Sequence, residues 1–138
     1  MEALGRLHNL AGSSIAAARR VSVKDCDAFA LLVVNPAANL VTVNQHTLQS
    51  GGTTAALNFT RRYAQTTSGV WVVSTQASGN TFTPAGTEDL VVVEFSTDTL
   101  ADGFTYVSAT IATAGELVWI THDLNVQRAP ANLADLLA

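Results

Sequence analysis

The sequence predicts an all-β protein, an antiparallel β-sandwich or jelly roll, with a short N-terminal helix or arm and a C-terminal tail. The 138 residues are 48% hydrophobic and only 13% charged, a composition typical of one compact domain. From Val21 onward the apolar residues follow a period near two, and β-branched residues predominate. Short segments of this kind recur about every 8–15 residues between Gly, Pro, Asn or Asp, with no helical pattern between them, which favours a sandwich.

Residues 1–20 are expected to form an arm or helix that precedes a single sandwich domain at residues 21–138. The apolar side chains of this segment recur at helical steps: Leu4, Leu7, Leu10 or Ala11, Ile15 and Ala18. Gly5 and Gly12 each cost about 1 kcal/mol relative to Ala inside a helix, so such a helix would need a surface to pack on. That surface could be the end of its own domain or another subunit. The arginines follow the apolar stretch instead of preceding it, so no secretion signal is expected.

The remaining chain is expected to form strands and a final hook. The expected strands are 28–34, 40–48, 54–62, 69–75, 81–83, 89–95, 104–112 and 116–123. The first of them is a continuous apolar run that ends at Asn35-Pro36, because proline cannot donate to a sheet. In the hook at residues 124–138, Leu133, Leu136 and Leu137 share one face of a short helical turn. These leucines need burial, either on the sandwich or on a neighbouring subunit.

The charges exclude some functions and leave one question open. A net charge of -4 and a pI near 5.1 argue against a nucleic-acid-binding surface, and no apolar run approaches the roughly 20 residues that cross a membrane. Residues 1–62 sum to +3 and residues 63–138 to -7. If the fold keeps these halves on separate faces, copies could meet head to tail. If strands from both halves interleave, the asymmetry disappears in space.

The sequence contains no recognisable catalytic or metal-binding motif. No G-x-S-x-G motif occurs, and His8, His46 and His122 stand in unrelated contexts. Cys26 lies between two aspartates, which raise the pKa of a thiol, so it is interpreted as a half-buried residue at a strand start. The sequence shows neither zinc-type His/Cys spacing, nor an EF-hand loop, nor a phosphate-binding glycine loop. We therefore expect no enzyme activity, no cofactor and no metal ion.

Aromatic residues keep a sugar-binding interpretation open, because sandwiches often present them on a flat face. The two tryptophans, however, lie within apolar strand runs, Trp71 in VWVV and Trp119 in LVWI. Such positions favour the core or a contact between subunits over a solvent-facing platform.

The second half of the chain carries a pattern that is similar to a known group of proteins. The residues concerned are Val93, Glu94, Phe95, Leu100, Asp102, Gly103, Phe104, Tyr106, Val107, Arg128, Pro130, Asn132 and Leu133. Together with the strand pattern over residues 28–134, they resemble small all-β virion proteins of tailed bacteriophages and prophages. The resemblance implies a structural role, since such proteins decorate or cement the capsid surface, usually as symmetric oligomers, or contribute to the tail.

The resemblance and the low charge together predict a non-enzymatic virion structural protein, a capsid decoration or cement protein made in the host cytoplasm. Its expected partners are the major capsid protein and further copies of itself, as a trimer or dimer, with no nucleic acid or membrane. The expected contact residues are Leu4, Leu7, Leu10, Ile15, Trp71, Trp119, Leu133, Leu136 and Leu137. The alternative is a tail module or a carbohydrate-binding adhesion sandwich.

Overall fold

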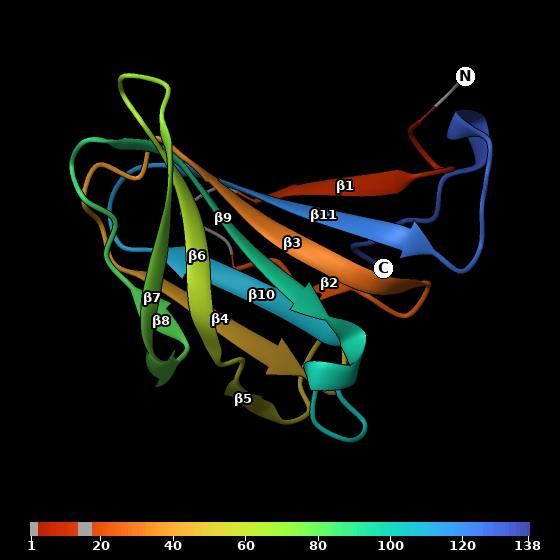
Figure 1. Cartoon of the computed structure of the whole chain (residues 1–138). Coiled ribbons are helices and arrows are strands. Elements are labelled where there is room, and N and C mark those ends of the chain that lie inside the picture. The colour runs from red at the N-terminus through yellow and green to blue at the C-terminus, as the bar shows by residue number, and fades with distance from the viewer. Residues whose placement is uncertain (1–2, 14–17) are drawn as a thin grey trace.

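The computed structural model describes residues 3–13 and 18–138 and shows two antiparallel sheets packed together (Figure 1). The predicted all-β antiparallel sandwich is confirmed. A six-stranded sheet, the large sheet, has the order β1-β11-β3-β9-β6-β7. A five-stranded sheet, the small sheet, has the order β2-β10-β4-β5, with β8 beside β4. Within the described ranges, no helix has the length and apolar character that a membrane span requires.

The strands match most of the expected segments to within a few residues. The large sheet contains β1 (His8–Ser13), β3 (Cys26–Val34), β6 (Phe59–Thr66), β7 (Trp71–Gly79), β9 (Glu88–Ser96) and β11 (Glu116–Leu124). The small sheet contains β2 (Val21–Ser22), β4 (Val41–His46), β5 (Thr54–Ala56), β8 (Thr81–Phe82) and β10 (Tyr106–Ile111). Two short 3-10 turns, η1 (Thr97–Thr99) and η2 (Pro130–Asn132), complete the structure.

The prediction of one strand over residues 54–62 is wrong, because the chain changes sheets in its middle. β5 pairs with β4 in the small sheet, whereas β6 pairs with β7 and β9 in the large sheet. Leu57, which lies between them, is buried, and its N–H donates to the carbonyl of Val43 at 3.2 Å. The crossover therefore places an apolar side chain in the core at the point where the chain leaves one ladder and joins the next.

The prediction of an N-terminal helix is also wrong over the residues that the structure describes. His8–Ser13 forms β1, which pairs along its length with β11 at one edge of the large sheet. Within it Ala11 is buried and Leu10 is exposed, an alternation with period two that the helical spacing of the leucines conceals. Gly5 adopts a φ of 81°, which supports the turn that leads into the strand. Ile15 lies outside the described residues.

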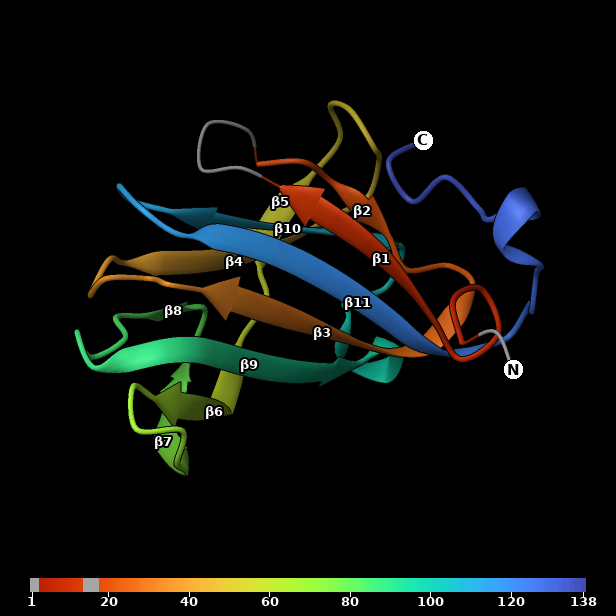
Figure 2. The same cartoon turned by 90° about the horizontal axis from the view of Figure 1, so that it is seen from above.

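The oppositely charged halves of the chain interleave in space. In the large sheet, β1 and β3 come from the first half and alternate with β11 and β9 from the second, while β6 spans the boundary at residue 62 and β7 comes from the second half. Figure 2, which views the molecule from above, shows this alternation across β1, β11, β3 and β9. The charge asymmetry of the sequence therefore does not become a two-faced molecule.

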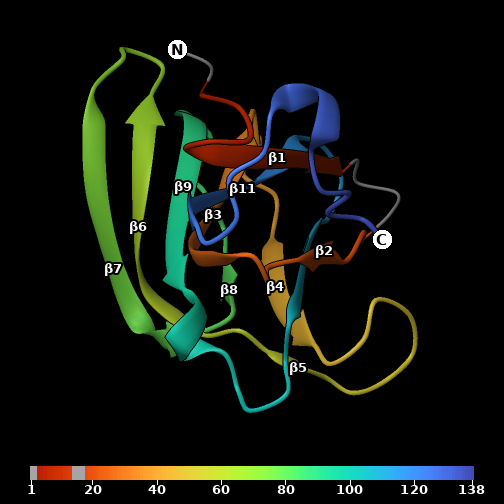
Figure 3. The same ribbon diagram turned by 90° about the vertical axis from the view of Figure 1, so that its right-hand side faces the viewer.

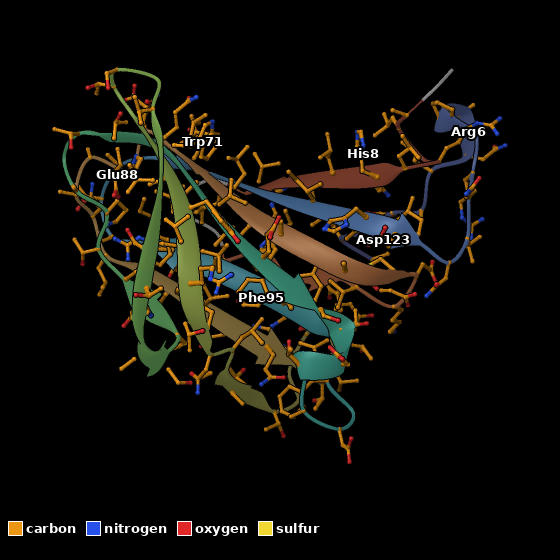
Figure 4. The ribbon with its side chains drawn as sticks, viewed as in Figure 1. Arg6, His8, Trp71, Glu88, Phe95 and Asp123 are labelled. Carbon is orange, nitrogen blue, oxygen red and sulfur yellow. The ribbon has the colours of Figure 1, made fainter. Side chains whose placement is uncertain are left out.

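The core lies between the sheets and is centred on a cluster of aromatic rings. Phe29 and Phe95 stack with ring centroids 5.3 Å apart, and Trp119 lies 5.9 Å from Phe29. Phe95 points from β9 into the space between the sheets (Figure 4). From the small sheet, Val41, Val43, Val107, Ala109 and Ile111 complete this core.

The C-terminal hook packs on its own domain. Leu136 is only 9% exposed and belongs to the core cluster, and its carbonyl accepts a hydrogen bond from the N–H of Ser22 at 2.7 Å. Figure 3 shows this segment passing close to β2. The predicted helical turn is wrong in position, since η2 precedes the leucines instead of containing them. Of the two surfaces left open for the hook, the structure uses that of the same molecule.

Candidate interaction surface

The face of the large sheet that points away from the core is largely apolar. Directly opposed residues of antiparallel strands share a face, so the register gives the rows of side chains across it. The central row runs over five strands as Val118, Leu32, Val92, Tyr63 and Val73. Flanking rows contribute Leu10, Ile120 and Ala30 on one side and Val34, Leu90, Gln65 and Trp71 on the other. We call this set of residues the outer face.

Charged side chains stand in the two flanking rows of the outer face, where Glu94 is opposite Ala30 and Glu116 is opposite Val34, and the central row is uncharged. Arg61 and Glu94 are exposed toward one end of the strands, in the row that contains Ala30, where together with Tyr63 they line a shallow hollow. Glu116 is exposed and Glu88 half-buried at the other end. The central row, from Val118 to Val73, contains no charged side chain. An antiparallel sheet of a sandwich usually alternates apolar and polar residues so that its outer side faces water, and the outer face departs from that rule.

Exposure is greatest along β7, which forms one edge of the large sheet. The exposed fractions are 57% for Val70, 52% for Trp71, 45% for Val72 and 57% for Val73. Trp71 and Val73 belong to the outer face, because they stand opposite Gln65 and Tyr63. Val72 stands opposite Ala64 and belongs to the other face of the strand. The strand thus presents large apolar side chains to solvent on both of its faces.

The contact residues that the sequence predicts differ in burial and do not form one surface. Leu7 and Leu10 are exposed, and Leu4, Leu133 and Leu137 are half-buried. Trp71 is exposed, so its interpretation as a core residue is wrong. Trp119 is fully buried, so it packs the core as expected and cannot also contact a partner. Only Leu10 and Trp71 lie on the outer face, at its opposite edges (Figure 4 shows Trp71 and β1).

Most of the outer face was missed by reasoning from the sequence. The members that were missed include Leu32, Val92 and Val118 of the central row and Ile120 of a flanking row. The signal that could have found them is the continuous apolar run, seen in AFALLVV and DLVVVEF. In a strand whose side chains alternate between faces, an unbroken run makes both faces apolar, and only one of them is covered by the small sheet.

Inside the molecule, the buried His46 contacts a serine and a threonine, the kind of pairing that a catalytic site would need. His46 Nε2 lies 2.8 Å from Ser108 Oγ, and His46 Nδ1 lies 2.8 Å from Thr54 Oγ1. Burial, with a smaller effect from Arg20, lowers the pKa of His46. Ser108 is 3% exposed, and a hydroxyl takes the place of the orienting carboxylate of a catalytic triad. The arrangement satisfies the hydrogen-bonding groups of side chains that are buried in the fold.

The Cys26 thiol and the His122 imidazole have surroundings that are typical of structural residues. Burial, reinforced by Asp27, Asp25 and Asp123, raises the pKa of the Cys26 thiol to about 12. His122 Nδ1 lies 3.2 Å from Asp123 Oδ2 at the surface, as a rim histidine beside a turn aspartate. Within residues 3–13 and 18–138, no cluster of His, Cys, Asp and Glu side chains is arranged to hold a metal ion.

A small hollow of about 20 Å³ lies under the C-terminal segment and has room for about one water molecule. Its lining includes Gly5, Cys26, Leu124 and Leu136. The geometry thus points to a surface, the outer face with β7, as the candidate site.

Comparison with protein-family models, with curated proteins and with solved structures found no match for this chain.

Proposed function

We propose that this protein is a non-enzymatic virion structural protein of a tailed bacteriophage, a decoration or cement protein that self-associates and binds the major capsid protein at the capsid surface. The observation that carries the proposal is the apolar outer face of the large sheet. The resemblance of residues 28–134 to small all-β virion proteins supplies the identity of the partner.

The size of the outer face supports a docking role. Strands lie about 4.8 Å apart and residues on one face of a strand about 6.6 Å apart, so the patch from β11 to β7 has a projected area on the order of 500 Å². The largest apolar patches of ordinary monomers cover roughly 300–600 Å² and are often functional. The outer face lies in the upper part of that range, so it is large enough for a contact that is repeated over a lattice of identical subunits.

The composition of the outer face also fits a cementing role. Val, Ile, Leu and Tyr side chains lose less conformational entropy on contact than Lys or Glu, so a contact made of them is stabilised at lower entropic cost. Each contact can be modest, because an oligomer that binds several lattice sites gains avidity from the high effective concentration.

Co-sedimentation with empty shells of the source particle tests the proposal. Val92→Lys places a charge in the centre of the outer face, whereas Leu48→Lys places the same charge at a residue that is 55% exposed in the loop after β4. We expect wild type and Leu48→Lys to pellet with the shells and Val92→Lys to bind at least about tenfold more weakly, a loss of about 1.4 kcal/mol. Equal binding of all three proteins, or no binding by wild type, would overturn the proposal. Thermal unfolding confirms that each variant is folded.

A second candidate, carbohydrate binding, is favoured by one specific observation. Tyr63 and Trp71 border a shallow hollow on the outer face together with Val92 and Glu94. An aromatic surface beside a carboxylate can stack on a sugar ring and accept hydrogen bonds from its hydroxyl groups. A glycan array with wild type and Trp71→Ala separates the candidates. Binding that is lost on substitution supports the adhesion module, and a blank array supports the cement protein.

A further inference from the structure

The edge strand β7 is exposed in a way that face-to-face docking of the large sheet does not explain. Contact through the outer face covers Trp71 and Val73 but leaves Val72 on the other side of the strand in water. Only an element that lies alongside β7, in the plane of the sheet, contacts both faces of the strand at once. The four consecutive exposed residues from Val70 to Val73 therefore indicate an edge-on partner.

The two edges of the large sheet differ in how they are protected. At β1, the Leu10 N–H donates to the side-chain oxygen of Asn9 at 2.8 Å, and the Asn9 amide donates to the carbonyl of Ala134 at 3.1 Å. At β7, the described strands provide β6 as a neighbour on one side and none on the other. Figure 3 shows β7 outermost in the sheet. Natural sheets blunt open edges with charges or proline, and the segment from Trp71 to Gly79 contains neither.

The hydrogen bonds of the β6–β7 hairpin fix which backbone groups point outward. The Thr66 N–H donates to the carbonyl of Val70 at 2.9 Å, so Val70 turns its backbone oxygen toward β6. In antiparallel strands this direction alternates from one residue to the next. Val72 therefore faces β6, whereas Trp71 and Val73 present their N–H and C=O groups to the open edge.

We propose that β7 pairs in antiparallel fashion with β7 of a second copy of this chain, about a two-fold axis at Val72, so that the large sheets of two molecules join into one. The inference deepens the proposed function by naming the surface of self-association, and it rests on that function for the biological role of the dimer. A two-fold axis fits the outward backbone groups, because Trp71 and the partner's Val73 then exchange hydrogen bonds in both halves of the contact.

This register matches the side chains as well as the backbone. On the outer face, Trp71 lies beside the partner's Val73, an aromatic and β-branched pair of the kind that stabilises antiparallel sheets. On the other face, Val72 lies beside the partner's Val72. The apolar row that ends at Tyr63 and Val73 thereby continues into the second molecule.

The charges near the edge agree with pairing between identical copies. β7 contains no ionisable side chain, so no like charges stand opposite each other. The ionisable side chains nearest to β7 are Arg61 and Arg62 on β6, one strand away from the proposed contact. A contact made through one strand falls below the standard interface size of about 1,200–2,000 Å², so the dimer is expected to depend on concentration.

Cross-linking tests the register directly. At a non-hydrogen-bonded antiparallel pair the Cα atoms are about 4.5 Å apart, within the range of about 4.4–6.8 Å that disulfides require. Val72→Cys is expected to give a disulfide-linked dimer on mild oxidation, while Leu48→Cys, at a residue that is more exposed (55% against 45%), stays monomeric. Cys26 does not interfere, because it is buried. Absence of the Val72→Cys dimer at a concentration where wild type is dimeric would overturn the register.

A charge exchange at the same residue tests the two-fold axis in solution by light scattering. Val72→Lys and Val72→Glu each place two like charges opposite each other, so each alone is expected to dimerise at least about tenfold more weakly than wild type. Their mixture is expected to restore a dimer that contains one copy of each. A wild-type monomer at all concentrations, or dimers that both variants leave unchanged, would refute edge pairing.

The outcomes distinguish this inference from the proposed function. Solution mass reports on the β7 contact without any capsid, and co-sedimentation with shells reports on the capsid without requiring a dimer. If Val72→Lys is monomeric and still pellets with shells, edge pairing and capsid binding are separate properties of two surfaces. If wild type dimerises through β7 but never binds shells, edge pairing stands and the proposed function fails.

Discussion

Replacing Trp119 by phenylalanine separates two opposing contributions of the buried indole to stability. Trp119 is fully buried and lies 6.2 Å from the ring of Phe95, and its Nε1 finds no hydrogen-bond acceptor among the described residues. Phenylalanine lacks two of the indole carbons, which costs about 1.6 kcal/mol at about 0.8 kcal/mol per buried carbon. Removing the unpaired N–H returns about 1–3 kcal/mol. We therefore expect Trp119→Phe to change the free energy of unfolding by about 1 kcal/mol or less.

Urea unfolding followed by far-UV circular dichroism measures this change, with Trp119→Ala as the control. The alanine variant leaves a large cavity and is expected to lose about 3–5 kcal/mol. Both variants should keep the dependence of unfolding free energy on urea concentration, so that a shift of midpoint reports stability alone. If Trp119→Phe loses as much as Trp119→Ala, the indole N–H makes a stabilising hydrogen bond and the reasoning is refuted.

Two further predictions concern pH and backbone conformation. Because the pKa of His46 is lowered in the folded protein, its contribution to stability is complete above pH 6.5 and is lost as the pH falls through 6.5 toward the folded pKa, by at most about 1.4 kcal/mol per pH unit. Chemical unfolding between pH 7.5 and 5.5 should show this loss in wild type and a flatter profile in His46→Gln; parallel profiles would contradict it. Ala38 has a φ of 59°, which glycine adopts more easily, so Ala38→Gly should raise stability by a few tenths to about 1 kcal/mol. The same change at the exposed strand residue Ala56 should lower stability by about 0.5–1 kcal/mol. Thermal unfolding measures both variants, and a loss of stability in Ala38→Gly as well as in Ala56→Gly would contradict the strain at Ala38.

The sequence predicts the fold class well because the period of its apolar residues is a local property. Alternation after Val21 and the bounding Gly, Pro and Asn residues identify most strands to within a few residues. The same local reasoning fails where the tertiary structure decides. β1 exists because the edge of β11 offers hydrogen-bonding partners over 100 residues away, and no spacing of leucines within residues 1–20 reports that edge.

The interaction surface was predicted less well, and for a related reason. Trp71 and Trp119 stand in similar apolar runs, yet Trp71 lies on the edge strand β7, whereas Trp119 lies on β11, between β1 and β3, with its side chain in the core. Burial depends on which strands lie on either side and on where the small sheet ends. Neither is encoded in the run itself, so the two tryptophans cannot be told apart without the strand order.

The pairing of β1 with β11 determines how late during synthesis the protein can finish folding. The first strand of the chain completes the sheet only beside the last, so a polypeptide still emerging from the ribosome cannot close its fold. Until synthesis of residues 116–124 ends, the long runs of valine and leucine that later form two sheets remain accessible to chaperones and to other nascent chains. High-level expression is therefore expected to favour insoluble material, and slower translation at low temperature to favour the native protein.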